Sequence, residues 1–359
     1  MKSVKIREKM IGDQYPAFII AEMAWSHDGS PENAKRIIDA AADAGADAIC
    51  FHLTSMEDYM VPHYRSGKGR VSAGKETMPI YEYLSRINLS FEDWAQLFPY
   101  AKKRGLLICT MCNDFPSLKH ATTLETDSYV ISPASLVEEE FIRETARKSK
   151  PIFLRIGGAT LEEIKRAIAW IKEEGNEDIV LIYGFQSYPT EIKEMHLRFI
   201  TTLKQNFKLS VGFADHTDGG SDLALVIPLI AMAFGANVIE KHLTYDRSAR
   251  GEDFESALDP PVFKKFVKWV REVESSFGSP EVRPLSKAEL EYREIARKRA
   301  VAAREIEEGE RITQEMVAFK RSDEGIFPDE IKKVIGKMAI ARIRKNEPIT
   351  LNKFRDEAE

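Results

Sequence analysis

Two histidines stand where an apolar run gives way to a polar loop. His216 closes the run LSVGFADH, directly after Asp215, and His242 lies in NVIEKHLT, two residues after Glu240. Two imidazoles bind a first-row divalent ion well and leave coordination positions for water or a substrate oxygen. An ion held in this way polarises a carbonyl group. The pattern predicts a divalent metal site at His216 and His242; the alternative is two unrelated histidines in loops.

The elements that must position these residues follow one repeating pattern. Between residues 17 and 278, short apolar runs alternate with segments of helical hydrophobic periodicity. The runs span residues 17–24, 47–54, 106–112, 129–135, 151–158, 178–185, 209–216 and 237–244. Alternating strands and helices imply right-handed βαβ units, and eight units over about 260 residues are typical of a closed (β/α)8 TIM barrel. An open doubly wound sheet is the alternative, although no GxGxxG motif follows the first run.

In such a barrel the active site lies at the carboxyl ends of the strands. The further polar side chains expected there are those of Glu22, Cys50, His52, Thr110, Arg155, Gln186 and Tyr188. On a strand alternate residues share a face, so Cys50 and His52 point the same way, as do Glu240 and His242. The candidate catalytic residues are Glu22, His52, Asp215 and Glu240.

The composition narrows the class of protein. The 359 residues carry a net charge of −5, which gives no broad cationic surface for nucleic acid. No apolar run is long enough to cross a membrane, and the first residues, MKSVKIREKMIGDQYP, lack the apolar core of a signal peptide. Three cysteines argue against a disulfide framework. We expect a soluble cytoplasmic protein.

One connection within the barrel pattern is unusually long. Residues 55–89 separate the second apolar run from its helix and carry a basic, glycine-rich tip at residues 67–70. Connections of this length in a compact domain are often lids or contact surfaces. The segment predicts a lid or a subunit contact, with an unimportant insertion as the alternative.

The character of the chain changes after Gly278. We expect a barrel over residues 1–279, a charged linker over 280–297 and a small β-rich domain over 298–359. The last segment has two related halves, each with a short alternating run, a charged turn and then Ile-Thr. A β-rich domain of this size is too small to be comfortably stable without a partner surface, which favours a binding or capping module.

Several sequence words occur together in an order that marks one family. They are AEMAWSHDG (21–29), SYPT (187–190), GFADHT (212–217), IEKHLTYDR (239–247), RGEDFESALDP (250–260) and KRSDEGI (320–326). With these words the chain resembles the sialic acid synthase family, which includes the legionaminic and pseudaminic acid synthases, over essentially its whole length. The resemblance implies a barrel followed by an antifreeze-protein-like (SAF) domain.

The resemblance also implies an activity and a set of contacts. Family members condense phosphoenolpyruvate with the open-chain aldehyde of an N-acyl hexosamine, or its 6-phosphate, using Mn²⁺ or Mg²⁺. In this chain His216 and His242 would hold the metal. The side chains that would contact the sugar are Glu22, Tyr188 and Asp246. Arg321 would reach from the SAF domain into the barrel of the partner subunit, in a domain-swapped homodimer.

The chain departs from the family where the phosphate and carboxylate of phosphoenolpyruvate would be held. The residues at these positions are Cys50, His52, Val130, Pro133, Arg155, Gln186 and Ala214. Cys50 and Val130 stand where the family has lysines, and Arg155 stands where it has a serine. Each charged hydrogen bond lost would remove about 1.5–3 kcal/mol, and a trianion needs cationic partners. Arg155 brings one new cation to this half of the pocket.

The residues for the metal and the sugar are kept, whereas those for phosphoenolpyruvate are changed. Three functions are compatible with this difference. The first is a divergent nonulosonic acid synthase that holds phosphoenolpyruvate through Arg155, with Thr110 and Gln186 as further substrate-binding residues. The second is a metal-dependent aldolase, isomerase or epimerase that acts on a sugar or sugar phosphate without phosphoenolpyruvate. His52 or Cys50 would then be its acid or base. The third is a sugar-binding paralogue without catalytic activity.

Overall fold

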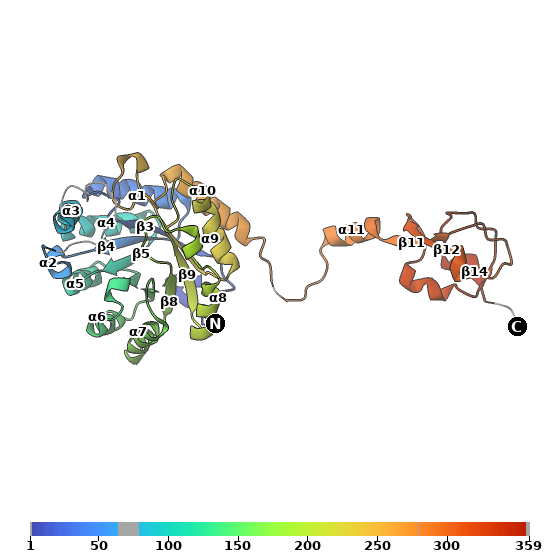
Figure 1. Ribbon diagram of the computed structural model, residues 1–359, viewed down its shortest axis with the longest axis horizontal. Coiled ribbons are helices and arrows are strands. Elements are labelled where there is room, and N and C mark those ends of the chain that lie inside the picture. Colours follow the sequence, from blue (N-terminus) through green and yellow to red (C-terminus); the bar gives the residue numbers. More distant parts are fainter. Residues whose placement is uncertain (1, 64–78, 280, 357–359) are drawn as a thin grey trace. The chain divides into compact units, whose positions relative to one another are not determined.

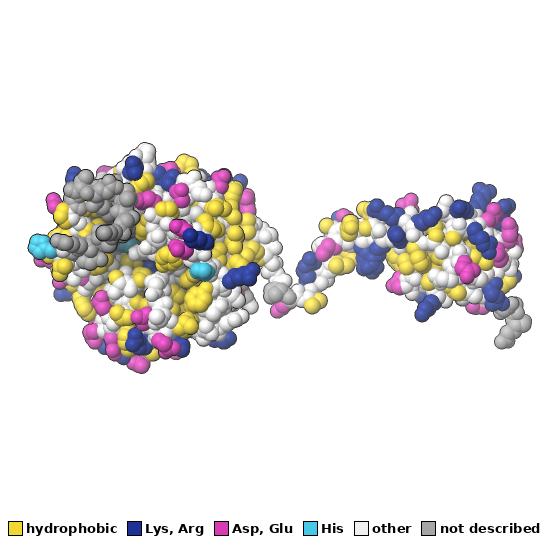
Figure 2. All heavy atoms as spheres, viewed as in Figure 1, with side chains coloured by type: hydrophobic (Ala, Val, Ile, Leu, Met, Phe, Trp, Pro, Cys, Tyr) yellow, Lys and Arg dark blue, Asp and Glu magenta, His cyan; other side chains and the backbone are white. Residues whose placement is uncertain are grey.

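The computed structural model describes residues 2–63, 79–279 and 281–356. The chain divides into two compact units, Met1–Gly278 and Ser279–Glu359, and each is described by itself. The basic tip at residues 67–70 lies outside the described residues. Lys, Arg, Asp and Glu side chains are interspersed over the visible surface of each unit (Figure 2), as the balanced charge of the sequence predicts.

The first unit is a closed barrel of parallel strands, in the order β10-β3-β4-β5-β6-β7-β8-β9. The strands are β3 (Phe18–Ala24), β4 (Ala48–Leu53), β5 (Leu107–Cys112), β6 (Ser128–Ile131), β7 (Ile152–Arg155), β8 (Ile179–Tyr183), β9 (Ser210–Asp215) and β10 (Val238–His242). Each strand coincides with one of the eight apolar runs of the sequence, and only β6 begins outside its run, one residue earlier. The predicted (β/α)8 barrel is therefore confirmed, and the doubly wound alternative is wrong because β10 pairs with β3 and closes the sheet.

Helices surround the strands (Figure 1). They are α1 (Pro31–Ala44), α4 (Phe91–Lys103), α5 (Phe115–Thr123), α6 (Glu139–Ala146), α7 (Leu161–Glu173), α8 (Phe199–Phe207), α9 (Leu223–Ala233) and α10 (Pro260–Glu274), with α2 (Met56–Tyr59) and α3 (Ile80–Ile87) in the β4–α4 connection. Local sequence sets several boundaries. Ser90 begins α4 with a capping box to Asp93, Thr160 begins α7 in the same way with Glu163, and Gly45 ends α1 with a φ of 83°.

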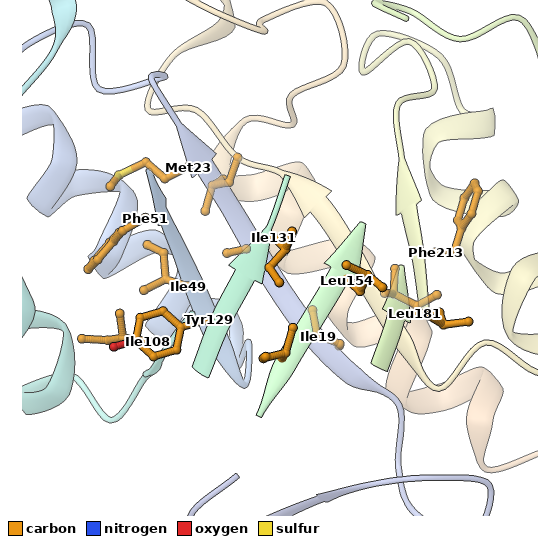
Figure 3. Packing of buried hydrophobic residues seen from close by; sticks show 14 of the residues in the cluster. Ile19, Met23, Ile49, Phe51, Ile108, Tyr129, Ile131, Leu154, Leu181 and Phe213 are labelled. Carbon is orange, nitrogen blue, oxygen red and sulfur yellow. The ribbon is translucent and has the colours of Figure 1, made fainter. Parts of the chain in front are cut away.

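The strands bury side chains on both faces. One layer packs outward against the helices, and Figure 3 shows part of it with Ile49, Phe51 and Ile108 among its members. The other layer fills the lower lumen and includes Ile20, Met111, Val130, Phe153 and Ile182. Because this lumen layer is apolar and buried, the polar strand ends above it form the lining of a shallow mouth.

A short hairpin of β1 (Val4–Ile6) and β2 (Lys9–Ile11) precedes the barrel. Val4, Ile6 and Ile11 are buried and belong to the same apolar cluster as the lower lumen. The hairpin therefore caps the amino-terminal end of the barrel, a feature that the sequence analysis did not predict.

The second unit is small and rich in β-structure. It consists of α11 (Lys287–Ala296), the antiparallel pair β11 (Lys298–Ala302) and β12 (Val317–Arg321), and the short pair β13 (Met338–Ala339) and β14 (Phe354–Arg355). Its core has its own buried apolar cluster, which includes Ile306, Ile312 and Val334. Within the described parts of the chain, no helix combines the length and apolar character needed to cross a membrane.

Candidate active site at the mouth of the barrel

The strand register brings the predicted residues to one level. Glu22 on β3 lies opposite His242 on β10 and opposite Cys50 on β4. Asp215 on β9 lies opposite Lys241 on β10. The side chains of Glu22, His52, Arg155, Asp215, His216, Glu240 and His242 are all buried. The structure thus places Glu22, His52, Glu240 and the two histidines around the upper lumen. Asp215 alternates along β9 with the lumen residue Ala214, so its side chain faces the helix layer.

The two predicted metal ligands face each other. The ring centroids of His216 and His242 are 5.2 Å apart, and the ring of Tyr188 meets both edge-on at 5.1 and 5.6 Å. Burial lowers the pKa of His242 to about 3 and, with the neighbouring imidazole of His242, lowers the pKa of His216 well below its usual value. None of their ring nitrogens has a hydrogen-bond partner among the described residues. Neutral, unpartnered imidazoles offer the lone pairs that a divalent ion needs.

Arg155 lies between two carboxylates. Its Nη2 contacts Glu22 Oε2 and lies 2.7 Å from Glu240 Oε2. Burial opposes the charge of this guanidinium, but Glu240 and Glu22 raise its pKa well above the usual value. Burial also raises the pKa of Glu240, to about 7, against the effect of Arg155. Arg155 points into the lumen, but its charge is already matched by protein carboxylates.

Glu22 is held from several sides. Besides Arg155, its Oε1 accepts a hydrogen bond from the Ala24 backbone N–H at 2.8 Å and lies 3.1 Å from His52 Nε2. Burial alone would raise the pKa of Glu22, but His52 and Arg155 lower it well below its usual value. Glu22 is therefore an anchored, ionised carboxylate.

The Asp215 carboxylate is also held by hydrogen bonds to both of its oxygens. Its Oδ2 accepts from Lys241 Nζ at 2.7 Å, and its Oδ1 accepts from the Thr217 backbone at 3.0 Å and from the Thr217 hydroxyl. Both Asp215 and Lys241 are buried. These contacts fix the chain on either side of His216, so Asp215 positions that imidazole. Lys241 shares the helix-facing side of β10 with Ile239, so its charge does not reach the lumen.

Glu22, Cys50 and His52 form a second group that could hold an ion, because one ligand atom from each lies within 4.8 Å of the others. Two observations favour the histidine pair instead. Burial raises the pKa of the Cys50 thiol well above its usual value, and a protonated thiol is a poor ligand. Arg155 already contacts Glu22, which places a positive charge where a cation would have to approach.

Other predicted substrate contacts lie elsewhere. Thr110 alternates along β5 with the lumen residues Cys109 and Met111, and its hydroxyl lies 2.6 Å from that of Thr126. It therefore faces the helix layer, and its predicted substrate contact is wrong. Gln186 is exposed in the β8–α8 connection.

Asp246 and Arg321 are engaged in local hydrogen bonds. The Asp246 carboxylate caps a short 3-10 turn by accepting from the Ser248 backbone at 2.8 Å. Arg321, in the second unit, donates from Nε and Nη2 to the Ile295 carbonyl at 3.1 and 3.0 Å.

Asp253 was not among the site residues predicted from the sequence. This residue is buried in the connection after β10, and its Oδ2 lies 3.9 Å from His242 Nδ1. The signal was present in the word RGEDFESALDP, whose acidic residues follow the strand end closely. Asp253, rather than Asp246, is the aspartate beside the histidine pair.

Comparison with known proteins identifies the family. Residues 37–282 match the NeuB family, and residues 297–355 match the SAF domain. The chain belongs to the NeuB family. Pseudaminic acid synthase of Campylobacter jejuni is 32% identical, over 94% of this chain and 96% of that protein. The N,N'-diacetyllegionaminic acid synthase of Legionella pneumophila is 30% identical, over 90% of this chain and 91% of that protein.

A solved structure gives the same picture. The N-acetylneuraminic acid synthetase of Leptospira borgpetersenii, in complex with citrate, superposes with a TM-score of 0.70 at 26% identity, over 81% of this chain and 96% of that one. The resemblance to the sialic acid synthases, the barrel and the SAF domain are thus confirmed. The relatives named here are synthases of pseudaminic, legionaminic and N-acetylneuraminic acid.

Proposed function

We propose that this NeuB family member is a metal-dependent synthase that joins phosphoenolpyruvate to the open-chain aldehyde of an N-acyl hexosamine, or of its 6-phosphate. The observation that carries this proposal is the pair of neutral, unpartnered imidazoles of His216 and His242, framed by Tyr188 at the barrel mouth. The named synthases among its relatives support the reaction class.

Each residue of the candidate site has a proposed role in this reaction. His216 and His242 would hold Mn²⁺ or Mg²⁺, which when bound polarises the aldehyde carbonyl. Tyr188 and Asp253 border the metal position and would contact the sugar. Asp215 and Lys241 fix the backbone that carries the imidazoles. We also propose that the second unit of one subunit covers the barrel of another in a homodimer, with Arg321 as its contact to substrate.

A second candidate function is favoured by the charges of the lumen. Arg155 is already paired with Glu22 and Glu240 in the lumen. Lys241 faces the helix layer, where it pairs with Asp215. The nearby wall is apolar and includes Cys50, Val130 and Ala214. A phosphate and a carboxylate would find few free cations there. These observations suit a metal-dependent aldolase, isomerase or epimerase that acts on a sugar or sugar phosphate without phosphoenolpyruvate.

Product analysis separates the candidates. The Mn²⁺-loaded full chain is incubated with phosphoenolpyruvate and a panel of N-acyl hexosamines and their 6-phosphates, and phosphate release and product mass are measured. Phosphate release that needs both substrates, and that is lost in His242→Ala, supports the synthase. Conversion of a sugar alone, followed by proton NMR, supports the second candidate. Sugar binding in calorimetry without any turnover indicates the non-catalytic paralogue and refutes both.

A further inference from the structure

A buried histidine lies beside the predicted metal ligands without being one of them. His52 Nε2 is 3.1 Å from Glu22 Oε1, and its ring meets Trp25 edge-on at 5.4 Å. Its side chain is only 5% exposed, and neither ring nitrogen makes a hydrogen bond among the described residues, although Nε2 lies close to the carboxylate. A buried imidazole with one nitrogen near a carboxylate and the other unpartnered is arranged as proton-transfer groups are.

Glu22 is better suited to orient this imidazole than to move protons itself. The contacts with Arg155, the Ala24 N–H and His52 use both of its oxygens. A carboxylate held in this way stays ionised and fixes a neighbouring ring, as in the carboxylate–histidine pairs of hydrolases.

The strand order places this pair next to the site of reaction. β10, β3 and β4 are neighbours in the barrel, and at the upper lumen they carry His242, Glu22 and His52 respectively. His52 therefore stands across Glu22 from the metal position. The imidazole of His52 and the proposed metal ligand His242 thus flank the same carboxylate, that of Glu22.

We propose that His52 is a catalytic acid–base residue and that Glu22 is its positioning residue. This inference rests on the proposed function, because it assigns the proton transfers of that reaction. The assignment also applies to the second candidate, since aldol and isomerase chemistry on a sugar needs proton transfer at the same carbonyl.

One imidazole can carry out the proton transfer that the condensation requires. The enol carbon C3 forms a bond to the aldehyde carbon, and the carbonyl π electrons move to its oxygen, which takes one proton. A water oxygen bonds to C2, and both of its protons leave. When C2 becomes a ketone, the C2–O bond to phosphate breaks with its electron pair, and hydrogen phosphate departs with the second proton. His52 takes the first proton from water and gives it to the new alkoxide, so it ends in its starting state.

The test compares variants of the full chain in the reaction that the wild type catalyses. In His52→Gln we expect kcat to fall about 10²–10⁴-fold with little change in KM or in Mn²⁺ affinity by calorimetry. In His52→Ala a cavity replaces the ring, and added 4-methylimidazole, with Mn²⁺ in excess, should restore part of kcat. The same compound should not restore His52→Gln, because no cavity is present.

Two further variants test whether Glu22 and His52 act together and whether loss of a histidine elsewhere affects kcat. Glu22→Gln should lower kcat, and adding it to His52→Ala should cost little more, because groups that act as a unit are not additive. His120→Gln is the matched control. His120 lies on α5, stacks on the Phe91 ring and donates from Nε2 to the Phe91 carbonyl at 3.0 Å. It lies outside the barrel strands, so its variant should keep wild-type kcat.

The outcomes separate this inference from the function on which it rests. A His52→Gln variant with wild-type kcat, or a His52→Ala variant with lost Mn²⁺ binding and no rescue, overturns the acid–base assignment. A wild type that releases no phosphate but converts a sugar overturns the synthase, and the same rescue experiment then tests His52 on that sugar. A chain that turns over neither substrate set overturns both.

Discussion

Replacing Arg155 with methionine tests how the lumen is held together. The change removes the guanidinium that lies between Glu22 and Glu240 and keeps a long apolar side chain. The side chains of these carboxylates are 0% and 1% exposed, so water cannot take over the lost contacts. Removing one partner of a buried ion pair costs about 3–5 kcal/mol, because the charge left behind is uncompensated. We expect Arg155→Met to lower the free energy of unfolding of the barrel by about that amount.

Urea unfolding followed by tryptophan fluorescence measures this loss. All four tryptophans lie between residues 25 and 269, so the signal reports on the barrel and not on the second unit. Lys165→Met is the matched control, because Lys165 also pairs with a carboxylate, that of Glu162, but both side chains are more than half exposed and can be hydrated. The control should lose clearly less stability than Arg155→Met.

A different result would refute this account of Arg155. If Arg155 served mainly to bind the phosphate of phosphoenolpyruvate, Arg155→Met would lose that binding in calorimetry with a stability change under about 1 kcal/mol, as for a surface substitution. The two accounts therefore predict opposite pairs of results, one in unfolding and one in binding.

Three other predictions follow from the site and the fold. His216→Ala or His242→Ala should each abolish stoichiometric Mn²⁺ binding in calorimetry; unchanged binding would exclude this metal site. A mixture of Arg321→Ala subunits and His242→Ala subunits should regain part of the activity that each lacks, if the second unit works in the partner's barrel; no gain would mean that each barrel uses its own. Burial lowers the pKa of His27 to about 3 from a usual value of 6.5, so a pH-dependent penalty on folding is absent above about pH 6.5 and grows as the pH falls. It should reach about 2 kcal/mol at pH 5, so wild type should lose that much more stability than His27→Gln between pH 7.5 and pH 5, measured by urea unfolding; equal losses would contradict it.

The sequence predicted the barrel well because its signal is repeated. Eight apolar runs of similar length, each followed by a helical pattern, leave few other folds, and small errors at one run do not change the conclusion. The β1–β2 hairpin was missed because three-residue strands carry no period that stands out from their surroundings. The approach of His216 to His242 was predictable for the same reason as the barrel, since matched strand ends bring the two imidazoles together.

The details of side-chain pairing were not predictable in this way. Arg155 was expected to be free for a substrate, but Glu22 and Glu240 come from β3 and β10, far from it in sequence, and meet it only when the barrel closes. Thr110 failed because a one-residue difference in strand parity moves a side chain from the lumen to the helix layer. Asp253 was overlooked because loop residues follow no period at all.

The apolar cluster shared by the β1–β2 hairpin and the lower lumen determines from which end substrates can enter the barrel. Val4, Ile6 and Ile11 close the amino-terminal end of the barrel against Phe18 and Phe153. In the proposed condensation, both reactants must then enter at the opposite end of the barrel. The reactant that binds deeper has to enter first, so the proposed synthase should add its two substrates in a fixed order.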